Sequence, residues 1–253
     1  MKPEQDAYGR EVYDFYQGEA VTEIVERDDG FIDISSGPAA YFAPYKAWSP
    51  IQQTAIQLAR GHCLDIGCGP GRVCLYLQEK GLDVVVGIDN SPLAIHTARL
   101  RGVHDARLLS ITRASRNTLG TYDTIIMFGN NFGLFGSYKR AKWLLRRFYN
   151  MTSRDGRILA ESRNIYDTDN PDHLAFHERN REMGRMAGQI RIRIRYRTLK
   201  GPWFDYLMVS PQEMADIVAG TGWQISRLFE EEGGSNYTAV LEKACRITRN
   251  YLQ

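Results

Sequence analysis

The chain has no marked excess of charge and no long apolar run. Its 253 residues carry 32 lysines and arginines against 30 aspartates and glutamates, so the formal net charge is only +2. That balance gives no general reason for the chain to bind nucleic acid or a membrane surface. No apolar stretch is long enough to cross a bilayer, and the opening residues, MKPEQDAYGREV, lack the apolar core of a signal peptide. We therefore expect a globular, cytoplasmic protein without a membrane partner.

Disulfide and zinc patterns are also missing. The four cysteines, Cys63, Cys68, Cys74 and Cys245, match no zinc-site spacing, and a chain of this composition is not expected to use a disulfide framework. Three of them cluster in one apolar stretch, where we expect small, buried, reduced thiols. The sequence predicts no metal site.

Histidine is scarce, and only one pair has a suggestive spacing. His173 and His177 lie four residues apart, so on a helix they share one face. A metal would need a third ligand, which the sequence does not place. Three interpretations stay open: an exposed polar helix, a pair of metal ligands, or one histidine that acts as a general base.

What the sequence does have is a glycine-rich turn between a strand and a helix. The stretch CLDIGCGPGR starts at Cys63 and carries Asp65 on a short apolar strand into Gly67, Gly69 and Gly71. Glycines allow a tight turn and close backbone approach, and the helix that follows offers free N–H groups, as in sites for nucleotide-like ligands. The spacing is G-x-G-x-G, not the G-x-G-x-x-G of a dinucleotide site. It argues against a nicotinamide-dependent oxidoreductase, which we keep as an alternative.

A second strand supports the same site. The apolar run DVVVGI ends at Asp89, about 20 positions past the glycines, where nucleotide-binding folds place an acidic residue on ribose hydroxyls. Ser91 and Pro92 are typical of the N-cap and first position of a helix. Asp89 therefore stands at the carboxyl end of a strand, directly before a helix.

These two motifs resemble those of the class I, Rossmann-like S-adenosylmethionine-dependent methyltransferases, in which an acidic residue precedes G-x-G-x-G. The resemblance covers roughly residues 61–243 and implies S-adenosylmethionine as the cofactor. The cofactor-binding residues that it implies are Asp65, Gly67, Gly69, Gly71, Arg72, Asp89, Asn90, Ser110, Ile111 and Phe128.

The resemblance also implies a role for each part of this set. Asp65 orients the glycine loop and the methionine end of the cofactor, and Arg72 reaches the carboxylate. Asp89 holds the ribose hydroxyls, while Phe128 flanks the adenine. The chain departs from the family at the third strand, where Ser110 stands in place of the usual aspartate that accepts a hydrogen bond from the adenine amine.

Catalytic residues are not identified by any motif. Methyl transfer needs positioning, exclusion of water and, in some cases, removal of one proton, so no covalent nucleophile is required. The weak candidates for a catalytic role are Asn130, Asn131, His173, His177 and Tyr13.

Alternating strand and helix signals predict an α/β fold with a mostly parallel sheet and helices on both faces. Besides the two strands above, we expect strands at 106–111, 122–128, 157–162, 223–229 and 237–242. We expect helices at 73–80, 91–102, 137–150 and 211–219. A sheet of seven strands in the family's order is what the resemblance implies.

Two segments lie outside this core. We divide the chain into an aromatic N-terminal cap, 1–49, and a cofactor-binding domain, 50–253, with a lid-like insertion at about 164–209 that contains a β-hairpin. In the cap, an aromatic ring that covers the cofactor competes with rings that only pack the segment onto the domain.

Within the insertion, residues 189–197 alternate strictly, so three isoleucines and Tyr196 face one side and four arginines face the other. A solvated face of an edge hairpin, a dimer contact and a site for an anionic acceptor are the interpretations of the arginines. A homodimer is therefore possible.

The sequence thus predicts a methyltransferase that acts on a small molecule by in-line transfer from S-adenosylmethionine. The alternatives are a cofactor-binding protein without catalysis and a methyltransferase of RNA or protein. RNA binding would usually bring a basic module, which the sequence does not show.

Overall fold

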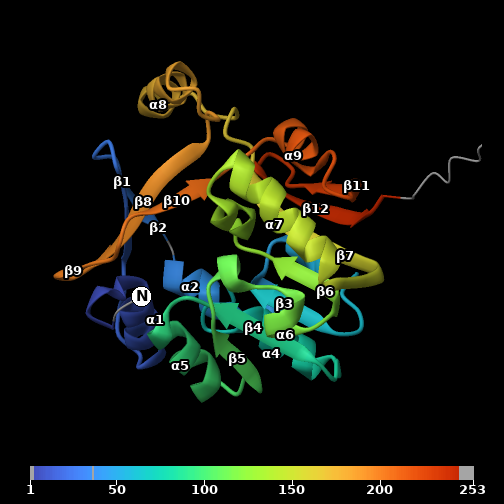
Figure 1. Ribbon diagram of the computed structural model, residues 1–253. Coiled ribbons are helices and arrows are strands. Elements are labelled where there is room, and N and C mark those ends of the chain that lie inside the picture. The colour runs from blue at the N-terminus through green and yellow to red at the C-terminus, as the bar shows by residue number, and fades with distance from the viewer. Residues whose placement is uncertain (1–2, 36, 245–253) are drawn as a thin grey trace, which may run out of the picture.

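The computed structural model describes residues 3–35 and 37–244, and these form two β-sheets with helices around them (Figure 1). The larger sheet has the order β11-β12-β7-β6-β3-β4-β5, and it is parallel except for β12, which runs antiparallel to both neighbours. Its strands are β3 (Cys63–Ile66), β4 (Val85–Asp89), β5 (Asp105–Leu108), β6 (Tyr122–Met127), β7 (Thr152–Arg163), β11 (Trp223–Glu230) and β12 (Asn236–Lys243). The predicted seven-stranded, mostly parallel sheet is confirmed.

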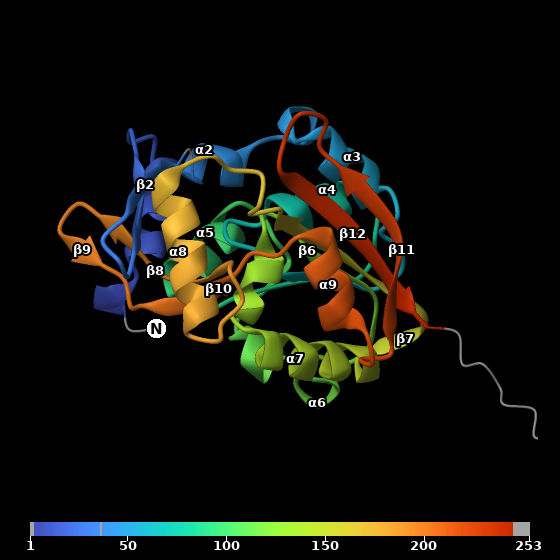
Figure 2. The same ribbon diagram turned by 90° about the horizontal axis from the view of Figure 1, so that it is seen from above.

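Helices cover both faces of this sheet (Figure 2). Successive strand residues point to opposite faces, so Leu64 and Ile125 pack toward α7 and α9 while Cys63 and Ile126 pack toward α3, α4 and α5. The helices around the sheet are α3 (Pro50–Ile56), α4 (Arg72–Glu79), α5 (Pro92–Leu100), α6 (Arg116–Leu119), α7 (Tyr138–Asn150) and α9 (Pro211–Val218).

Serine N-caps start most of these helices. The Ser91 hydroxyl accepts from the backbone N–H of Ala94, and Ser210 forms a reciprocal capping box with Glu213. Proline follows both caps at the first helical position, where its missing N–H costs nothing. The predicted helix starts at Ser91 and Ser210 are confirmed.

The smaller sheet is built from the two segments that were predicted to lie outside the core, the N-terminal segment and the insertion. Its order is β10-β8-β1-β2, all antiparallel, with β9 paired to β8. The strands are β1 (Glu23–Arg27), β2 (Ile32–Ser35), β8 (Gln189–Tyr196), β9 (Leu199–Lys200) and β10 (Phe204–Leu207). The N-terminal segment and the insertion therefore share one sheet, and the division at residue 49 stays a prediction.

Helices flank this second sheet (Figure 1). The remaining elements are η1 (Pro3–Gln5), α1 (Ala7–Tyr16), α2 (Gly37–Phe42), η2 (Tyr45–Ala47), η3 (Ile111–Arg113), η4 (Asn131–Phe135) and α8 (Pro171–Glu182). Asp6 ties α1 to the larger sheet, because its carboxylate accepts from the Ser91 hydroxyl at 2.8 Å and from the N–H of Leu93 at 3.0 Å.

Two predicted strand boundaries were wrong. β5 ends at Leu108 instead of residue 111, because Ser110 caps the short helix η3. β7 begins at Thr152 instead of residue 157, and its pairing with β6 shifts register between Thr152 and Arg157. In the insertion, Leu199 and Lys200 pair with β8 as the short strand β9.

The strand that carries the arginines is not an edge strand. β8 lies between β10 and β1, so the interpretation as a solvated edge hairpin is wrong in that respect. The alternation itself is confirmed, since Ile192 and Tyr196 are buried and Arg191 is exposed. Cys63, Cys68 and Cys74 are buried free thiols, as predicted, while Cys245 lies outside the described residues.

No helix in the described ranges is long and apolar enough to cross a membrane.

Candidate functional site

The glycine loop between β3 and α4 has the geometry that only glycine allows. Gly67, Gly69 and Gly71 have φ of 73°, 51° and 84°, which lie in the left-handed region. A Cβ at Gly67 would lie 2.5 Å from the Asn131 Nδ2, and one at Gly69 would lie 2.6 Å from the Tyr8 hydroxyl. The chain therefore needs glycine here both for its backbone conformation and for space.

Asp89 links the two sequence motifs. One of its carboxylate oxygens, Oδ2, accepts from the N–H of Gly69 at 3.0 Å, and Oδ1 accepts from the N–H of Ser91 at 2.9 Å. Burial raises the pKa of Asp89 to about 6, and these two backbone donors oppose that shift. Asp89 thus shapes the loop as well as standing at the ligand end of β4.

Asp65 lies under the loop with unused acceptor capacity. It is 3 % exposed, and its hydrogen-bond donor within the described ranges is the Cys74 thiol, at 3.6 Å. Burial raises the pKa of Asp65 to about 7, against the opposing effects of the Cys74 thiol and the Arg72 charge. A weak thiol donor leaves this carboxylate free to accept from a ligand.

A chain of hydrogen bonds connects α4 to the ends of β6 and β7. Arg72 Nη2 donates to Gln52 Oε1 at 3.2 Å, and Gln52 Nε2 donates to Glu161 Oε2 at 2.6 Å. The same Glu161 oxygen accepts from the N–H of Gly129 at 2.9 Å. The Arg72 guanidinium also lies 4.8 Å from the Trp48 ring centre, so this predicted residue is held in place from two sides.

The two predicted asparagines after β6 have different surroundings. Asn131 Nδ2 donates to the carbonyls of Ile66 and Gly67, at 2.9 and 3.0 Å, so this side chain braces the glycine loop. Asn130 has φ of 60°, and its buried Oδ1 has no hydrogen-bond partner in residues 3–35 and 37–244. Its carbonyl accepts from the Tyr206 hydroxyl at 2.5 Å. Asn130 therefore offers a free acceptor to a ligand.

Tyrosines from the N-terminal segment and from the insertion lie at this loop and at the residues that follow β6. Tyr8, from α1, places its hydroxyl at Gly69, and its ring meets that of Tyr41, from α2, edge to face at 5.6 Å. Tyr206, from β10, packs its ring against Gly133. Burial raises the pKa of all three phenols, so each stays protonated at neutral pH.

The remaining predicted cofactor contacts follow the strand ends. Asn90 comes directly after β4 and is exposed. The Ser110 hydroxyl caps η3 and lies 3.0 Å from that of Thr112, with Ile111 as the next residue. Phe128 is buried at the end of β6, against the edge of Trp48.

Three of the catalytic candidates do not meet the glycine loop. His173 contacts Thr168 and Phe31, and His177 contacts Tyr166, all on α8 or beside it. Figure 1 shows α8 far from α4. Tyr13 lies against His96, which is exposed on α5. The structure thus gives these three residues no place at the site.

Sequence reasoning missed several residues that the structure brings to this region. They are Tyr8, Tyr41, Gln52, Glu161 and Tyr206. Glu161 carried a signal, because a carboxylate inside the buried strand RILAES needs a partner. The tyrosines carried none, because the cap has many aromatic residues and only the fold selects among them.

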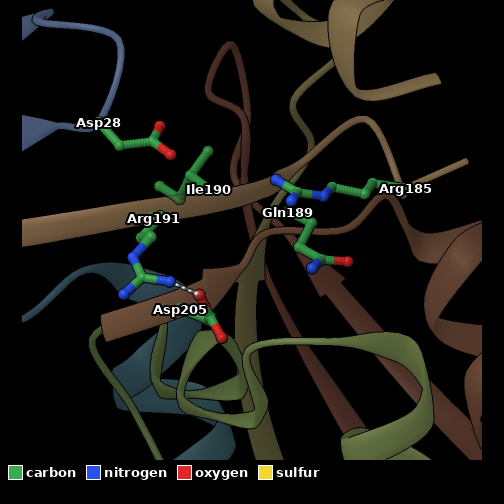
Figure 3. A pocket seen from close by; sticks show the side chains of 6 residues that line it. All are labelled: Asp28, Arg185, Gln189, Ile190, Arg191 and Asp205. Atoms are coloured by element: carbon green, nitrogen blue, oxygen red, sulfur yellow. Dashed lines mark ion pairs between the residues drawn. The ribbon is translucent and has the colours of Figure 1, made fainter. Parts of the chain in front are cut away.

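Two surface hollows lie away from the glycine loop. One of about 250 Å³ opens beside β8, where Arg191 points toward Asp205 at 3.9 Å (Figure 3). The other, of about 590 Å³, is lined by Arg27, Phe31 and Phe176, with the guanidinium 4.7 and 4.0 Å from the two ring centres. No group of three or more possible metal ligands gathers in the described ranges.

Known proteins share this arrangement. The family model "Methyltransferase domain" matches residues 63–156. The structure of an S-adenosylmethionine-dependent methyltransferase from Bacteroides fragilis, in complex with S-adenosyl-L-homocysteine, superposes with a TM-score of 0.81 and 29 % identity, over 96 % of this chain and 97 % of that one. The CcbJ methyltransferase from Streptomyces caelestis shares the fold, with a TM-score of 0.61 and 14 % identity over 81 % and 95 % of the two chains.

A curated relative matches over a shorter stretch. The glycine/sarcosine/dimethylglycine N-methyltransferase of Actinopolyspora halophila is 32 % identical over 111 residues, which are 42 % of this chain. The match spans only 19 % of that relative's length. With the glycine loop, the two strand-end aspartates and the sheet order, these matches confirm the predicted family. Residues 63–156 thus form a methyltransferase domain, and the chain is similar in sequence and fold to an S-adenosylmethionine-dependent methyltransferase over most of its length.

Proposed function

We propose that the chain transfers a methyl group from S-adenosylmethionine to a small-molecule acceptor. The observation that carries this proposal is that tyrosines from both segments outside the core lie at this end of the sheet: Tyr8 lies against Gly69, and Tyr206 lies against Gly133 and the Asn130 carbonyl. A covered site excludes water and admits a small molecule more readily than a folded macromolecule.

The residues present fit the cofactor. Asp65 has acceptor capacity to spare, the loop that follows it has a left-handed glycine backbone, and the Asn130 Oδ1 has no hydrogen-bond partner among the described residues. Asp65 and Arg72 would hold the amino-acid end, and Asp89 with Asn90 would hold the ribose. Ser110, Ile111 and Phe128 would line the adenine.

The cofactor, when bound, supplies a methyl group on a sulfonium that a nucleophile can displace. The chain contributes position and environment. Asn131 and Asp89 fix the backbone of the glycine loop, and the hydrogen bonds from Arg72 through Gln52 to Glu161 hold α4, α3 and β7 together. The neutral phenols of Tyr8 and Tyr41 supply aromatic faces, which favour a cation by about 0.5–2 kcal/mol each.

The arginines of β8 support a small acceptor over RNA. Arg193 and Arg195 pair with Glu26, and Arg197 pairs with Asp14 and Glu19. Because acidic side chains of the same protein already occupy these guanidinium groups, this face offers little net positive charge to a phosphate backbone. The A. halophila relative, whose name states small N-methyl acceptors, agrees with this choice.

Labelled methyl transfer from S-adenosylmethionine into fractionated cell extract tests the proposal. We expect label in the fraction below about 3 kDa, well under the size of a domain. Label in the RNA or protein fraction would move the acceptor to that class. Binding of S-adenosylhomocysteine without transfer to any fraction would indicate a cofactor-binding protein without catalysis. The cytoplasmic location and the homodimer stay predictions.

A further inference from the structure

A buried carboxyl group that accepts no hydrogen bond lies one helical turn from Tyr8. Glu11 on α1 is 0 % exposed, and neither of its carboxyl oxygens accepts a hydrogen bond from a donor in residues 3–35 and 37–244, although a protonated Glu11 can itself donate to Glu23. An unpaired buried acceptor costs about 1–3 kcal/mol, and more if it is charged. Folding alone therefore gives no reason for a glutamate at this position.

The group that faces Glu11 is a second buried carboxylate. Glu23 on β1 is 3 % exposed and accepts from the Tyr41 hydroxyl, at 3.0 Å to Oε2, and from the Ser35 hydroxyl. Burial, with Glu23 alongside, raises the pKa of Glu11 to about 11, so the free protein keeps a proton on this pair. The Tyr41 and Ser35 hydroxyls both donate to Glu23, so the oxygens of Glu11 can still accept hydrogen bonds from a ligand.

This pair connects to the methyl-transfer site through Tyr8 and Tyr41. Tyr8 and Glu11 lie three residues apart on α1, hence on one side of the helix, and the Tyr8 hydroxyl reaches Gly69. Tyr41 contacts the Tyr8 ring and donates to Glu23. Figure 1 shows α1, α2 and β1 on the same side of the molecule.

Two side chains near the tyrosines carry buried oxygens that accept from no donor in the described ranges. They are Glu11, through Oε1 and Oε2, and Asn130, through Oδ1. A ligand that satisfies them must carry several N–H or O–H groups, and the two carboxyl groups disfavour an anion. A protonated amine is the small donor that also gains from the tyrosine faces.

We propose that Glu11 and Glu23 form a subsite for a protonated amine on the methyl acceptor, with Tyr8 and Tyr41 as the walls between this subsite and the glycine loop. The inference rests on the proposed function and narrows it to amine-bearing acceptors. The proposal concerns recognition of the acceptor only, because the atom that receives the methyl group can differ from the nitrogen of this amine.

The test measures ligand binding to the full chain saturated with S-adenosylhomocysteine, by calorimetry. The probes are matched sets: phenethylamine, 2-phenylethanol and phenylacetate, and 1,4-diaminobutane, 1,4-butanediol and succinate. We expect an amine to bind at least tenfold more tightly than its alcohol and carboxylate in one set or both. Amines that bind no better than their alcohols in both sets would overturn the proposal.

Two variants locate the subsite. Glu11→Gln keeps the shape but removes the carboxyl group that could give up its proton when an amine binds, and we expect it to weaken amine binding ten- to hundredfold while S-adenosylhomocysteine binding stays within twofold. Glu19→Gln, an exposed glutamate of the same segment, is the matched control and should change neither. Glu23→Gln replaces Glu11→Gln if that variant fails to fold, and unchanged amine affinity in the folded variant contradicts the assignment.

The same titrations separate the two proposals. If the wild-type chain does not bind S-adenosylhomocysteine, the proposed function fails. If it binds S-adenosylhomocysteine but shows no preference for amines, only the amine subsite fails.

Discussion

Asp89 performs two tasks with one carboxylate, because it accepts from the backbone of Gly69 and Ser91 and stands where a ribose would lie. Its place at the end of β4 was predicted from spacing, whereas its hold on the glycine loop was not. A side chain that folds back onto a loop 20 residues earlier leaves no local pattern in the sequence.

We expect Asp89→Asn to raise the Kd for S-adenosylhomocysteine ten- to hundredfold, because charge-assisted hydrogen bonds contribute about 1.5–3 kcal/mol each. Isothermal titration calorimetry gives the Kd. The matched control is Asp105→Asn, whose carboxylate pairs with Arg107 near the surface of β5. An unchanged Kd in Asp89→Asn would remove this residue from the cofactor site.

Glu11 gives a pH prediction. Its pKa is about 11 in the folded protein, against an ordinary value of 4.5 in the unfolded chain, so the folded state binds one more proton between these values. The stability that this proton supplies is complete below about pH 4.5 and falls as pH rises toward 11, by at most about 1.4 kcal/mol per pH unit.

Glu11→Gln should remove that slope. Urea unfolding of wild type and variant at pH 6, 7, 8 and 9 measures it, and the wild type should lose unfolding free energy relative to the variant at each step. Parallel curves would show that Glu11 is already ionised in the folded protein.

At the scale of elements, the alternation in β8 predicted the strand and its two faces, but not its neighbours. Arg193 and Arg195 both pair with Glu26 on β1, and Glu26 precedes Arg193 by 167 residues. The short stretch EIVER at β1 has no feature that names its partner strand. Pairing across that distance depends on tertiary packing, which explains the wrong assignment of β8 to an edge.

The arginines of β8 should differ in their effect on stability. Arg193 makes two hydrogen bonds to Glu26, at 2.8 and 2.9 Å, and lies 4.4 Å from the Trp203 ring centre. Arg191 makes one exposed contact to Asp205 at 3.9 Å. We expect Arg193→Ala to lower Tm by roughly 2–4 °C and Arg191→Ala by roughly 1 °C or less.

Thermal unfolding by circular dichroism compares the two variants. Equal losses in Tm would mean that the hydrogen bonds to Glu26 contribute nothing beyond an exposed ion pair.

At the scale of the molecule, local patterns located the strands of the larger sheet, because helices with their own start signals, such as Ser91-Pro92, separate them, whereas the order of the strands came from the family resemblance. The glycine loop marked the ligand end of that sheet. The tyrosines at the site were beyond sequence reasoning, since Tyr8 and Tyr206 come from opposite halves of the chain.

The measurement that tests the central claim most directly is a calorimetric titration of the full chain with S-adenosylhomocysteine and, separately, with NADH. A ligand that binds only the native state at a hundred times its Kd adds about 2.7 kcal/mol of stability, so a thermal shift gives an independent check. The account predicts one S-adenosylhomocysteine per chain and no binding of NADH. Saturable binding of NADH, with none of S-adenosylhomocysteine, would contradict it.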